Sequence, residues 1–237
     1  MEPTNPGTLP STVPAGEVLR KGAEAILVKA EWLGREALFK VRTRKAYRIP
    51  QIDDRIRAER TVTEARILAS LLNAGIPVPG LLDVHLKEAT IVMELVHGAR
   101  LKDIVTPLRG KLARIFAQIG TAVARIHELD IIHGDLTTSN VIYESPLDND
   151  DIHFRFIDFG LARHTASVED KSVDIHLFKR VITSTHAGDY ERMFPPFMDG
   201  YKAHLERQGR SSDFKKIESR LEQIETRGRY VEKSKRK

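Results

Sequence analysis

The chain has 237 residues, of which 41% are hydrophobic and 30% are charged, a composition typical of globular proteins. It contains no cysteine, which excludes a disulfide framework and thiolate chemistry. No apolar run is long enough to span a bilayer, and no basic-then-apolar segment opens the chain, so we expect neither a membrane partner nor secretion. The net charge is +5.

The first residues and the segment after them have different patterns. Residues 1–16 carry four prolines among Ser, Thr and Gly without periodicity, and we expect them to be disordered and to take no part in the fold. Residues 25–28 and 37–41 have strand patterns on either side of a turn near Gly34, which predicts a hairpin.

Apolar periodicity predicts the remaining elements. They are a helix over 53–73, strands over 81–85 and 90–95, a helix over 111–128, a short hairpin over 141–143 and 153–157, and helices over 172–185, 189–206 and 212–226. Strands therefore dominate the first hundred residues and helices the rest. This order predicts an α+β fold with a strand-rich N-lobe over 17–95, a helical C-lobe over 96–226 and a basic tail over 227–237.

The most specific motif is His-Gly-Asp-Leu-Thr-Thr-Ser-Asn over 133–140, followed by Asp-Phe-Gly over 158–160. It places the Asp135 carboxylate, the Asn140 amide and the Asp158 carboxylate in the order that phosphoryl transfer requires. Asp135 would orient the attacking oxygen, and Asn140 and Asp158 would supply hard oxygen ligands for Mg²⁺. The alternative is that these residues merely cap turns.

Upstream residues fit the binding of ATP. Lys40 lies in a strand pattern and Glu64 on the following helix, and such a pair holds the α- and β-phosphates in kinases. Gly22 lies between two predicted strands, where it serves either a phosphate loop or a simple hairpin turn. The backbone of Glu94 and Val96, in the connector between the lobes, could bind an adenine ring.

Three further features concern the C-lobe. Asp174 either braces the catalytic loop or is an ordinary acid near a helix N-terminus. Only residues 161–173 separate Gly160 from Asp174, and no Ala-Pro-Glu follows. Thr137 also stands where protein kinases usually carry a lysine. We therefore expect a truncated activation segment and no platform for docking a peptide substrate.

The C-terminus is strongly basic. Residues 227–237 contain six basic residues and one acid, and such a segment attracts polyanions, although it could equally be a solvated end that aids solubility. The basic residues are Arg227, Arg229, Lys233, Lys235, Arg236 and Lys237.

Six separated segments, in order, resemble the small atypical kinases of the KEOPS complex. They are residues 21–25, 42–48, 59–66, 133–140, 169–174 and the Arg-Gly-Arg of 227–229. The resemblance implies an ATP- and Mg²⁺-dependent kinase or ATPase that supports threonylcarbamoyladenosine formation in tRNA, with possible serine/threonine autophosphorylation. It implies the threonylcarbamoyl transferase subunit and a small accessory subunit as partners, tRNA at the basic tail, and a cytoplasmic and nuclear location. Tyr230-Val231-Glu232 interrupts the basic residues, which departs from the family's usual tail.

Two other functions remain open. Small-molecule phosphotransferases also use His-Gly-Asp, then Asn and a later Asp, but generally have a longer helical region for the substrate than follows Asp174 here. A scaffold that keeps the fold without catalysis is the second alternative. The presence of Lys40, Glu64 and Asp135 together with Asn140 and Asp158 argues against such a loss.

Overall fold

The computed structural model describes residues 9–147 and 151–234, with the backbone alone for 227–234. The chain divides into two compact units, Met1–His97 and Gly98–Lys237, so that the boundary falls two residues after the one predicted. The first unit contains a sheet and a helix and the second is mainly helical, which confirms the predicted α+β class.

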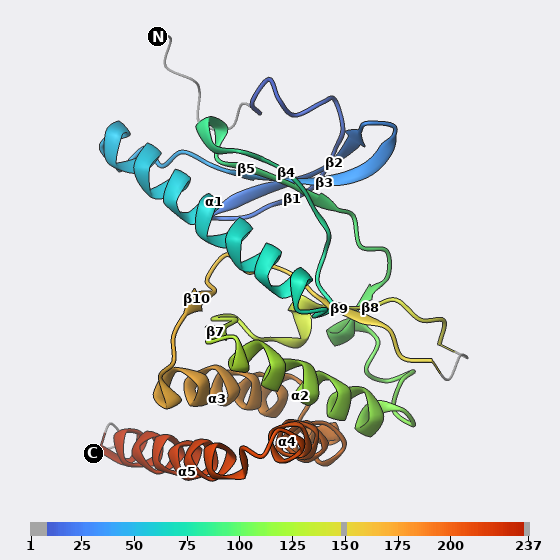
Figure 1. Ribbon diagram of the computed structural model, residues 1–237, viewed down its shortest axis with the longest axis vertical. Coiled ribbons are helices and arrows are strands. Elements are labelled where there is room, and N and C mark those ends of the chain that lie inside the picture. Colours follow the sequence, from blue (N-terminus) through green and yellow to red (C-terminus); the bar gives the residue numbers. More distant parts are fainter. Residues whose placement is uncertain (1–8, 148–150, 235–237) are drawn as a thin grey trace. The chain divides into compact units, whose positions relative to one another are not determined.

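The first unit is a five-stranded antiparallel sheet with one helix (Figure 1). The strands have the order β1-β2-β3-β5-β4, and α1 lies along the sheet. The element bounds are β1 Glu17–Lys21, β2 Ala25–Trp32, β3 Arg35–Arg42, α1 Pro50–Asn73, β4 Leu81–His85 and β5 Thr90–Glu94. The predicted hairpin is β2–β3. Its two-residue turn, Leu33 and Gly34, has φ of +49° and +80°, the left-handed backbone that such turns need.

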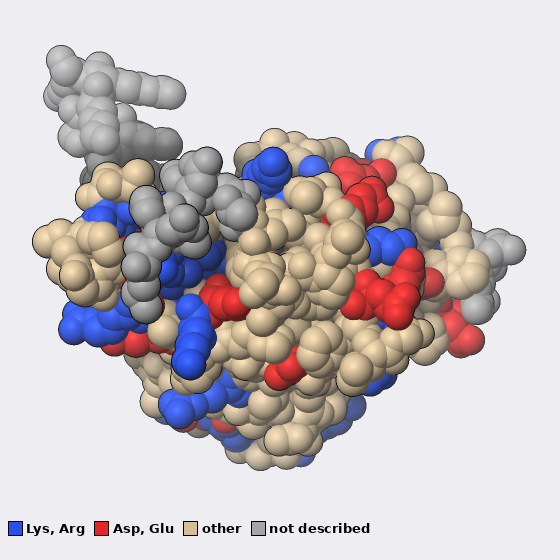
Figure 2. Space-filling model, turned by 90° about the horizontal axis from the view of Figure 1, so that it is seen from above, with Lys and Arg blue, Asp and Glu red and all other residues tan. Residues whose placement is uncertain are grey.

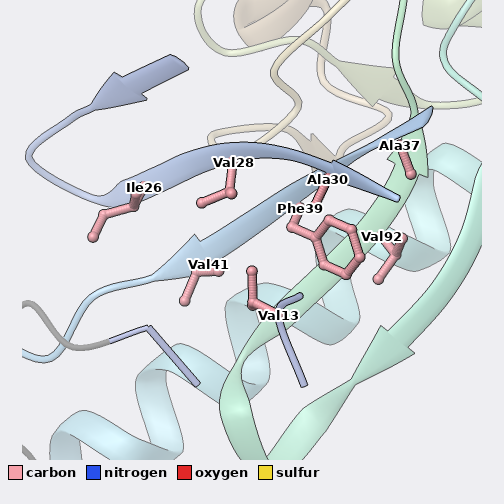
Figure 3. Close-up of a cluster of buried hydrophobic side chains, with 8 residues drawn as sticks. All are labelled: Val13, Ile26, Val28, Ala30, Ala37, Phe39, Val41 and Val92. Atoms are coloured by element: carbon pink, nitrogen blue, oxygen red, sulfur yellow. The ribbon is translucent and has the colours of Figure 1, made fainter. Parts of the chain in front are cut away.

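An apolar cluster covers the other face of this sheet (Figure 3). The side chain of Val13 points into it beside Phe39 and Val41 and is only 8% exposed, and Leu9 packs against the cluster's margin. The Thr12 hydroxyl also donates a hydrogen bond to Glu88. The prediction that residues 1–16 take no part in the fold is therefore wrong for 9–16; residues 1–8 lie outside the described part of the chain.

The physical reason for this error is that one buried side chain makes no periodic pattern. A turn in which the Val13 N–H donates to the Pro10 carbonyl at 3.0 Å brings Val13 onto the sheet. Prolines stiffen such a segment without requiring a helix or strand. A segment of low hydrophobicity can thus be ordered by the single apolar residue that fits an open sheet face.

The second unit combines short strand pairs with four helices. The element bounds are β6 Ala99–Arg100, α2 Leu112–Glu128, β7 Ile131–Ile132, β8 Val141–Tyr143, β9 Phe154–Phe156, β10 Arg163–His164, α3 Val168–Thr185, α4 Tyr190–Arg207 and α5 Ser211–Ser234. Helices α2 and α4 approach backbone to backbone: a Cβ at Gly120 would lie 1.9 Å from the Phe197 carbonyl oxygen, and one at Gly200 would lie 1.9 Å from that of Ala117. Only glycine fits at this crossing.

The C-terminal helix is longer than predicted. Helix α5 continues through Arg227 and Arg229 to Ser234, whereas the sequence pattern ended it at residue 226. Gly228 lowers helix propensity just after that point, but no proline interrupts the backbone there. Among the described residues, no helix is long and apolar enough to cross a membrane.

Charged side chains of both signs are mixed on the face drawn in Figure 2, with Lys and Arg gathered toward its left side. Several exposed pairs of the first unit bring opposite charges together, including Arg44 with Asp54 at 3.2 Å and Arg55 with Glu59 at 3.6 Å. Exposed pairs of this kind contribute little to stability because water and salt screen them.

Candidate active site

The first unit contains the predicted phosphate-binding pair. Lys40 lies on β3, the middle strand of the sheet, and Glu64 lies on α1. The Lys40 Nζ is 2.6 Å from the Glu64 Oε1, with residue exposures of 7% and 2%. Because side chains alternate along a strand, Phe39 and Val41 face the apolar cluster while Lys40 faces the helix. The lysine is thus buried and paired, as the strand pattern required.

The sequence reasoning missed a second cation on the same carboxylate. The Arg42 Nη2 lies 2.6 Å from the Glu64 Oε2, and Arg42 is only 4% exposed. Arg42 follows Lys40 by two positions and therefore shares its face of β3, a periodicity that could have revealed it. Glu64 thus binds one cation with each of its oxygens.

A further ion network ties the start of α1 to the end of β3. Asp53, 2% exposed, accepts from the Arg57 Nε at 3.0 Å and lies 3.3 Å from the Arg48 Nη1. Arg57 also donates to the backbone carbonyl of Arg42 at 3.3 Å. The N-terminal half of α1 is therefore held by charged contacts, whereas its C-terminal half buries Ile67, Leu68 and Leu71.

Gly22 lies in the turn between β1 and β2. Its N–H donates to the Ala25 carbonyl at 2.9 Å, and a Cβ on it would meet that oxygen at 3.2 Å. The turn is tied to α1 by Glu24 and Arg60, 2.5 Å apart, and Lys45 binds the carbonyl of Ala23. Gly22 therefore closes a hairpin turn, and its contact with phosphate stays a prediction.

The predicted adenine-binding residues lie at the end of β5 and just beyond it. The Glu94 N–H donates to the Gly80 carbonyl at 2.8 Å, and the Glu94 carboxylate accepts from the Gly80 N–H at 3.0 Å. Val96 follows in a segment without regular structure. The reciprocal bonds commit the Glu94 side chain and its backbone N–H to Gly80, and a contact of Glu94 with an adenine ring stays a prediction.

In the second unit, Asp135 and Asn140 are joined directly. The Asn140 Nδ2 donates to the Asp135 Oδ2 and to the Asp135 carbonyl, both at 2.9 Å. Asn140 is 7% exposed, whereas Asp135 is exposed. Because the amide nitrogen is committed to Asp135, the amide oxygen is the atom that Asn140 offers to a cation.

Asp158 lies beside this pair in an unusual backbone conformation. The N–H of Ile157, the preceding residue, donates to the Asn140 carbonyl at 2.9 Å. Asp158 itself has φ of +64°, a value that residues other than glycine rarely adopt, and its side chain is exposed. Strained backbone of this kind concentrates at functional positions, where neighbouring structure enforces it.

Asp174 braces the loop that carries Asp135. Its two carboxylate oxygens accept from the backbone N–H groups of His133 and Gly134, each at 2.9 Å, and the His127 Nε2 lies 3.2 Å away. Burial alone would raise the pKa of Asp174, but the His127 contact and the His133 bond hold that pKa below its ordinary value. The carboxylate is therefore ionised at neutral pH and stays bound to the loop.

Gly134 and His133 join the catalytic loop to the segment after Asp158. A Cβ at Gly134, where φ is +77°, would lie 2.3 Å from the Leu161 carbonyl oxygen. The His133 ring packs on Phe159 with ring centroids 4.6 Å apart, and burial lowers the pKa of His133, so the ring is neutral. These contacts align Asp135 and Asp158 on one rigid frame.

The segment after Gly160 is short and paired. Strand β10 pairs with β7 through Arg163 and His164, and α3 begins at Val168, with Ser167 accepting a hydrogen bond from the Asp170 N–H. Residues 161–167 therefore form the whole connection between Gly160 and α3. This geometry explains the shortened spacing seen in the sequence.

The predicted tRNA-contacting residues are only partly described. Arg227, Arg229 and Lys233 lie on α5, with nothing described of their side chains. The others, Lys235, Arg236 and Lys237, lie outside the described residues.

Comparison with known proteins agrees with this geometry. Residues 37–187 match the protein kinase domain family. The chain is 38% identical over 226 residues to the KEOPS complex subunit Bud32 of Pyrococcus abyssi, covering 92% of this chain and 98% of that protein. It is also 38% identical over 214 residues to a probable bifunctional tRNA threonylcarbamoyladenosine biosynthesis protein of Methanobrevibacter smithii, covering 90% of this chain. The chain spans 37% of the length of that bifunctional relative.

Proposed function

Since this chain belongs to the protein kinase family and, within it, to the family of the KEOPS subunit Bud32, we propose that it is an ATP-dependent kinase or ATPase supporting threonylcarbamoyladenosine formation in tRNA. The observation that carries the proposal is the coexistence of a buried Lys40–Glu64 pair with an Asn140 amide fixed on Asp135. A scaffold would not require a lysine to be buried against a carboxylate, because such a pair costs desolvation energy.

The donor atoms fit a magnesium nucleotide. Lys40 would hold the α- and β-phosphates, and Glu64 fixes the position of its ammonium group. The Asn140 amide oxygen and the Asp158 carboxylate are hard oxygen ligands, and Mg²⁺ typically combines one or two protein oxygens with phosphate oxygens and water. When bound, ATP with its metal would supply the transferable phosphoryl group.

The chain's own residues then orient the acceptor. Asp135 is exposed, and its Oδ2 accepts a hydrogen bond from the Asn140 Nδ2. Its Oδ1 would therefore orient the hydrogen of an attacking hydroxyl or water. Asp174 keeps the backbone of that loop fixed during the reaction. Thr137 in place of a lysine removes one cation near the transferred phosphate. The short connection between Gly160 and α3 offers little backbone for docking a peptide, so water or the chain's own serines and threonines are the proposed acceptors.

The proposed setting is a complex with tRNA. Relatives named as a KEOPS complex subunit and as tRNA threonylcarbamoyladenosine biosynthesis proteins support partnership in such a complex. The partners proposed here are a threonylcarbamoyl transferase subunit and a small accessory subunit. The basic end of the chain, from Arg227 onward, would approach tRNA phosphates. A cytoplasmic and nuclear location is part of this proposal.

The decisive experiment measures ATP turnover by the chain alone, then with its transferase partner and tRNA. We expect stimulation by both, lost in Asp135→Ala. Stimulation by a small-molecule acceptor instead would indicate a phosphotransferase.

A second measurement distinguishes the enzyme from a scaffold. If the chain binds MgATP, the nucleotide at 100 times its dissociation constant should stabilise the fold by about 2.7 kcal/mol. No shift in melting temperature with or without Mg²⁺ would favour a scaffold.

The tRNA contact has a separate test. Deleting residues 227–237 should weaken tRNA binding most at low salt and reduce the slope of log affinity against log salt, because fewer phosphate counterions are released. An unchanged slope would show that this end of the chain does not contact phosphate. Turnover of ATP by the isolated chain serves as the control for folding.

A further inference from the structure

We propose that Arg42 is a positioning residue, which holds Glu64 in place for Lys40 so that the phosphate-binding pair is assembled without help from an activation segment. The inference rests on the proposed function, because it concerns the same nucleotide-binding residues. It assigns a role to a buried arginine that the mechanism above does not use.

The Glu64 carboxylate is shared by two cations. Lys40 binds the Glu64 Oε1 and Arg42 binds Oε2, each at 2.6 Å. All three side chains are at least nine-tenths buried. Rotation of the carboxylate to follow one cation would break its bond with the other, so the two bonds together fix the direction in which Oε1 faces Lys40.

Arg42 also anchors α1 at two places. Its side chain binds Glu64, and its backbone carbonyl accepts from the Arg57 Nη1 at 3.3 Å. Arg57 and Glu64 are seven residues apart, which is about two turns or roughly 10 Å along a helix. A helix held to one strand residue at two such points resists both swinging away and turning about its axis.

The burial of these charges costs desolvation energy. Arg42 and Lys40 are two cations buried beside one carboxylate, and the Arg42 Nε has no hydrogen-bond partner. A buried ion pair is an inefficient way to gain stability, since desolvation offsets much of the attraction. An apolar residue of similar volume would fill this position at a lower desolvation cost, so stability alone does not account for the guanidinium.

The segment that follows Gly160 is short. In protein kinases, the helix that carries the glutamate is positioned by the activation segment and its phosphorylation. Here only residues 161–167 connect Gly160 to α3, and their strand residues pair with β7. Arg42 with Arg57 supplies, from within the first unit, the restraint that such a segment would provide.

The test compares Arg42→Met, Arg42→Lys and a surface control, Arg55→Met, which removes an exposed arginine of α1. Dissociation constants for MgATP are measured by calorimetry, together with kcat, KM and thermal unfolding. We expect Arg42→Met to weaken MgATP binding about tenfold, Arg42→Lys to recover part of the loss, and Arg55→Met to bind like the wild type.

The same substitution in a Glu64→Gln background separates positioning from direct contact. If Arg42 acts through Glu64, Arg42→Met causes little further loss of MgATP affinity there. An equal loss in both backgrounds, or a lower melting temperature with unchanged affinity in Arg42→Met, would overturn the inference. If the wild type itself binds no MgATP, it is the proposed function that fails.

Discussion

The two units hold their candidate residues by different physical means. In the first, Lys40 and Glu64 lie on a strand and a helix, and several buried charges fix the helix to the strand. In the second, Asp135 and Asp158 lie on loops, held by backbone hydrogen bonds and a ring contact. Regular elements position a side chain through many residues, whereas a loop depends on the few groups that bind its backbone.

This difference predicts unequal sensitivity to substitution. In the first unit, loss of one ion pair leaves others that still join α1 to β3. In the second, Asp174 alone binds the N–H groups of both His133 and Gly134. A single change at Asp174 should therefore disturb more than any single change among the ion pairs.

The largest effect is expected for Asp174→Ala. The substitution leaves the buried His133 N–H, the part-buried Gly134 N–H and the buried His127 Nε2 without their partner, which should cost about 3–5 kcal/mol of stability and abolish ATP turnover. Urea unfolding and turnover assays measure both effects. Asp199→Ala, an exposed acid of α4, is the control and should change stability by less than about 0.5 kcal/mol. A stability loss in Asp174→Ala no larger than in the control would refute the bracing role.

The lowered pKa of Asp174 predicts a pH dependence. Because the folded pKa lies below the unfolded value of about 3.9, the carboxylate stabilises the protein above that pH. This contribution is lost as the pH falls through the folded pKa. Unfolding free energies measured from pH 7 to pH 2 should therefore decline more steeply for the wild type than for Asp174→Asn. Parallel curves would show that Asp174 titrates normally.

A smaller effect is expected at Val13, whose packing supports the sheet without contacting the charged pair. Val13→Ala removes two buried methyl groups from the apolar cluster and should cost about 1–2 kcal/mol. Affinity for MgATP should not change, since β3 keeps its register. Loss of affinity matching the loss of stability would mean that the two faces of the sheet are coupled.

The sequence predicted the regular elements of both units well, because hairpin turns and apolar stripes repeat. The motif predicted that Asp135 and Asn140 lie together, as they do, since its spacing reflects a loop that can be built in few ways. Their catalytic and metal-binding roles stay predictions. Val13 escaped because a single buried side chain leaves no local period. Arg42 escaped although it shares the strand face of Lys40, because nothing in the local pattern shows that two cations bind one carboxylate. Helix α5 continues past its predicted end because helix propensity is a weak guide, and no proline in this segment interrupts the backbone.

Asp158 lies on a loop, whereas Lys40 and Glu64 lie on a strand and a helix, and this difference can be tested by substitution. With φ of +64°, Asp158 occupies a conformation that costs an alanine roughly 1 kcal/mol more than a glycine. Asp158→Gly should therefore be about 1 kcal/mol more stable than Asp158→Ala in urea unfolding, while both lose Mg²⁺-dependent turnover. Normal turnover in either variant would refute the metal assignment, and equal stabilities would show that the loop carries no strain there. Since Lys40 and Glu64 lie on regular backbone with negative φ, no glycine substitution among them can separate stability from activity in this way.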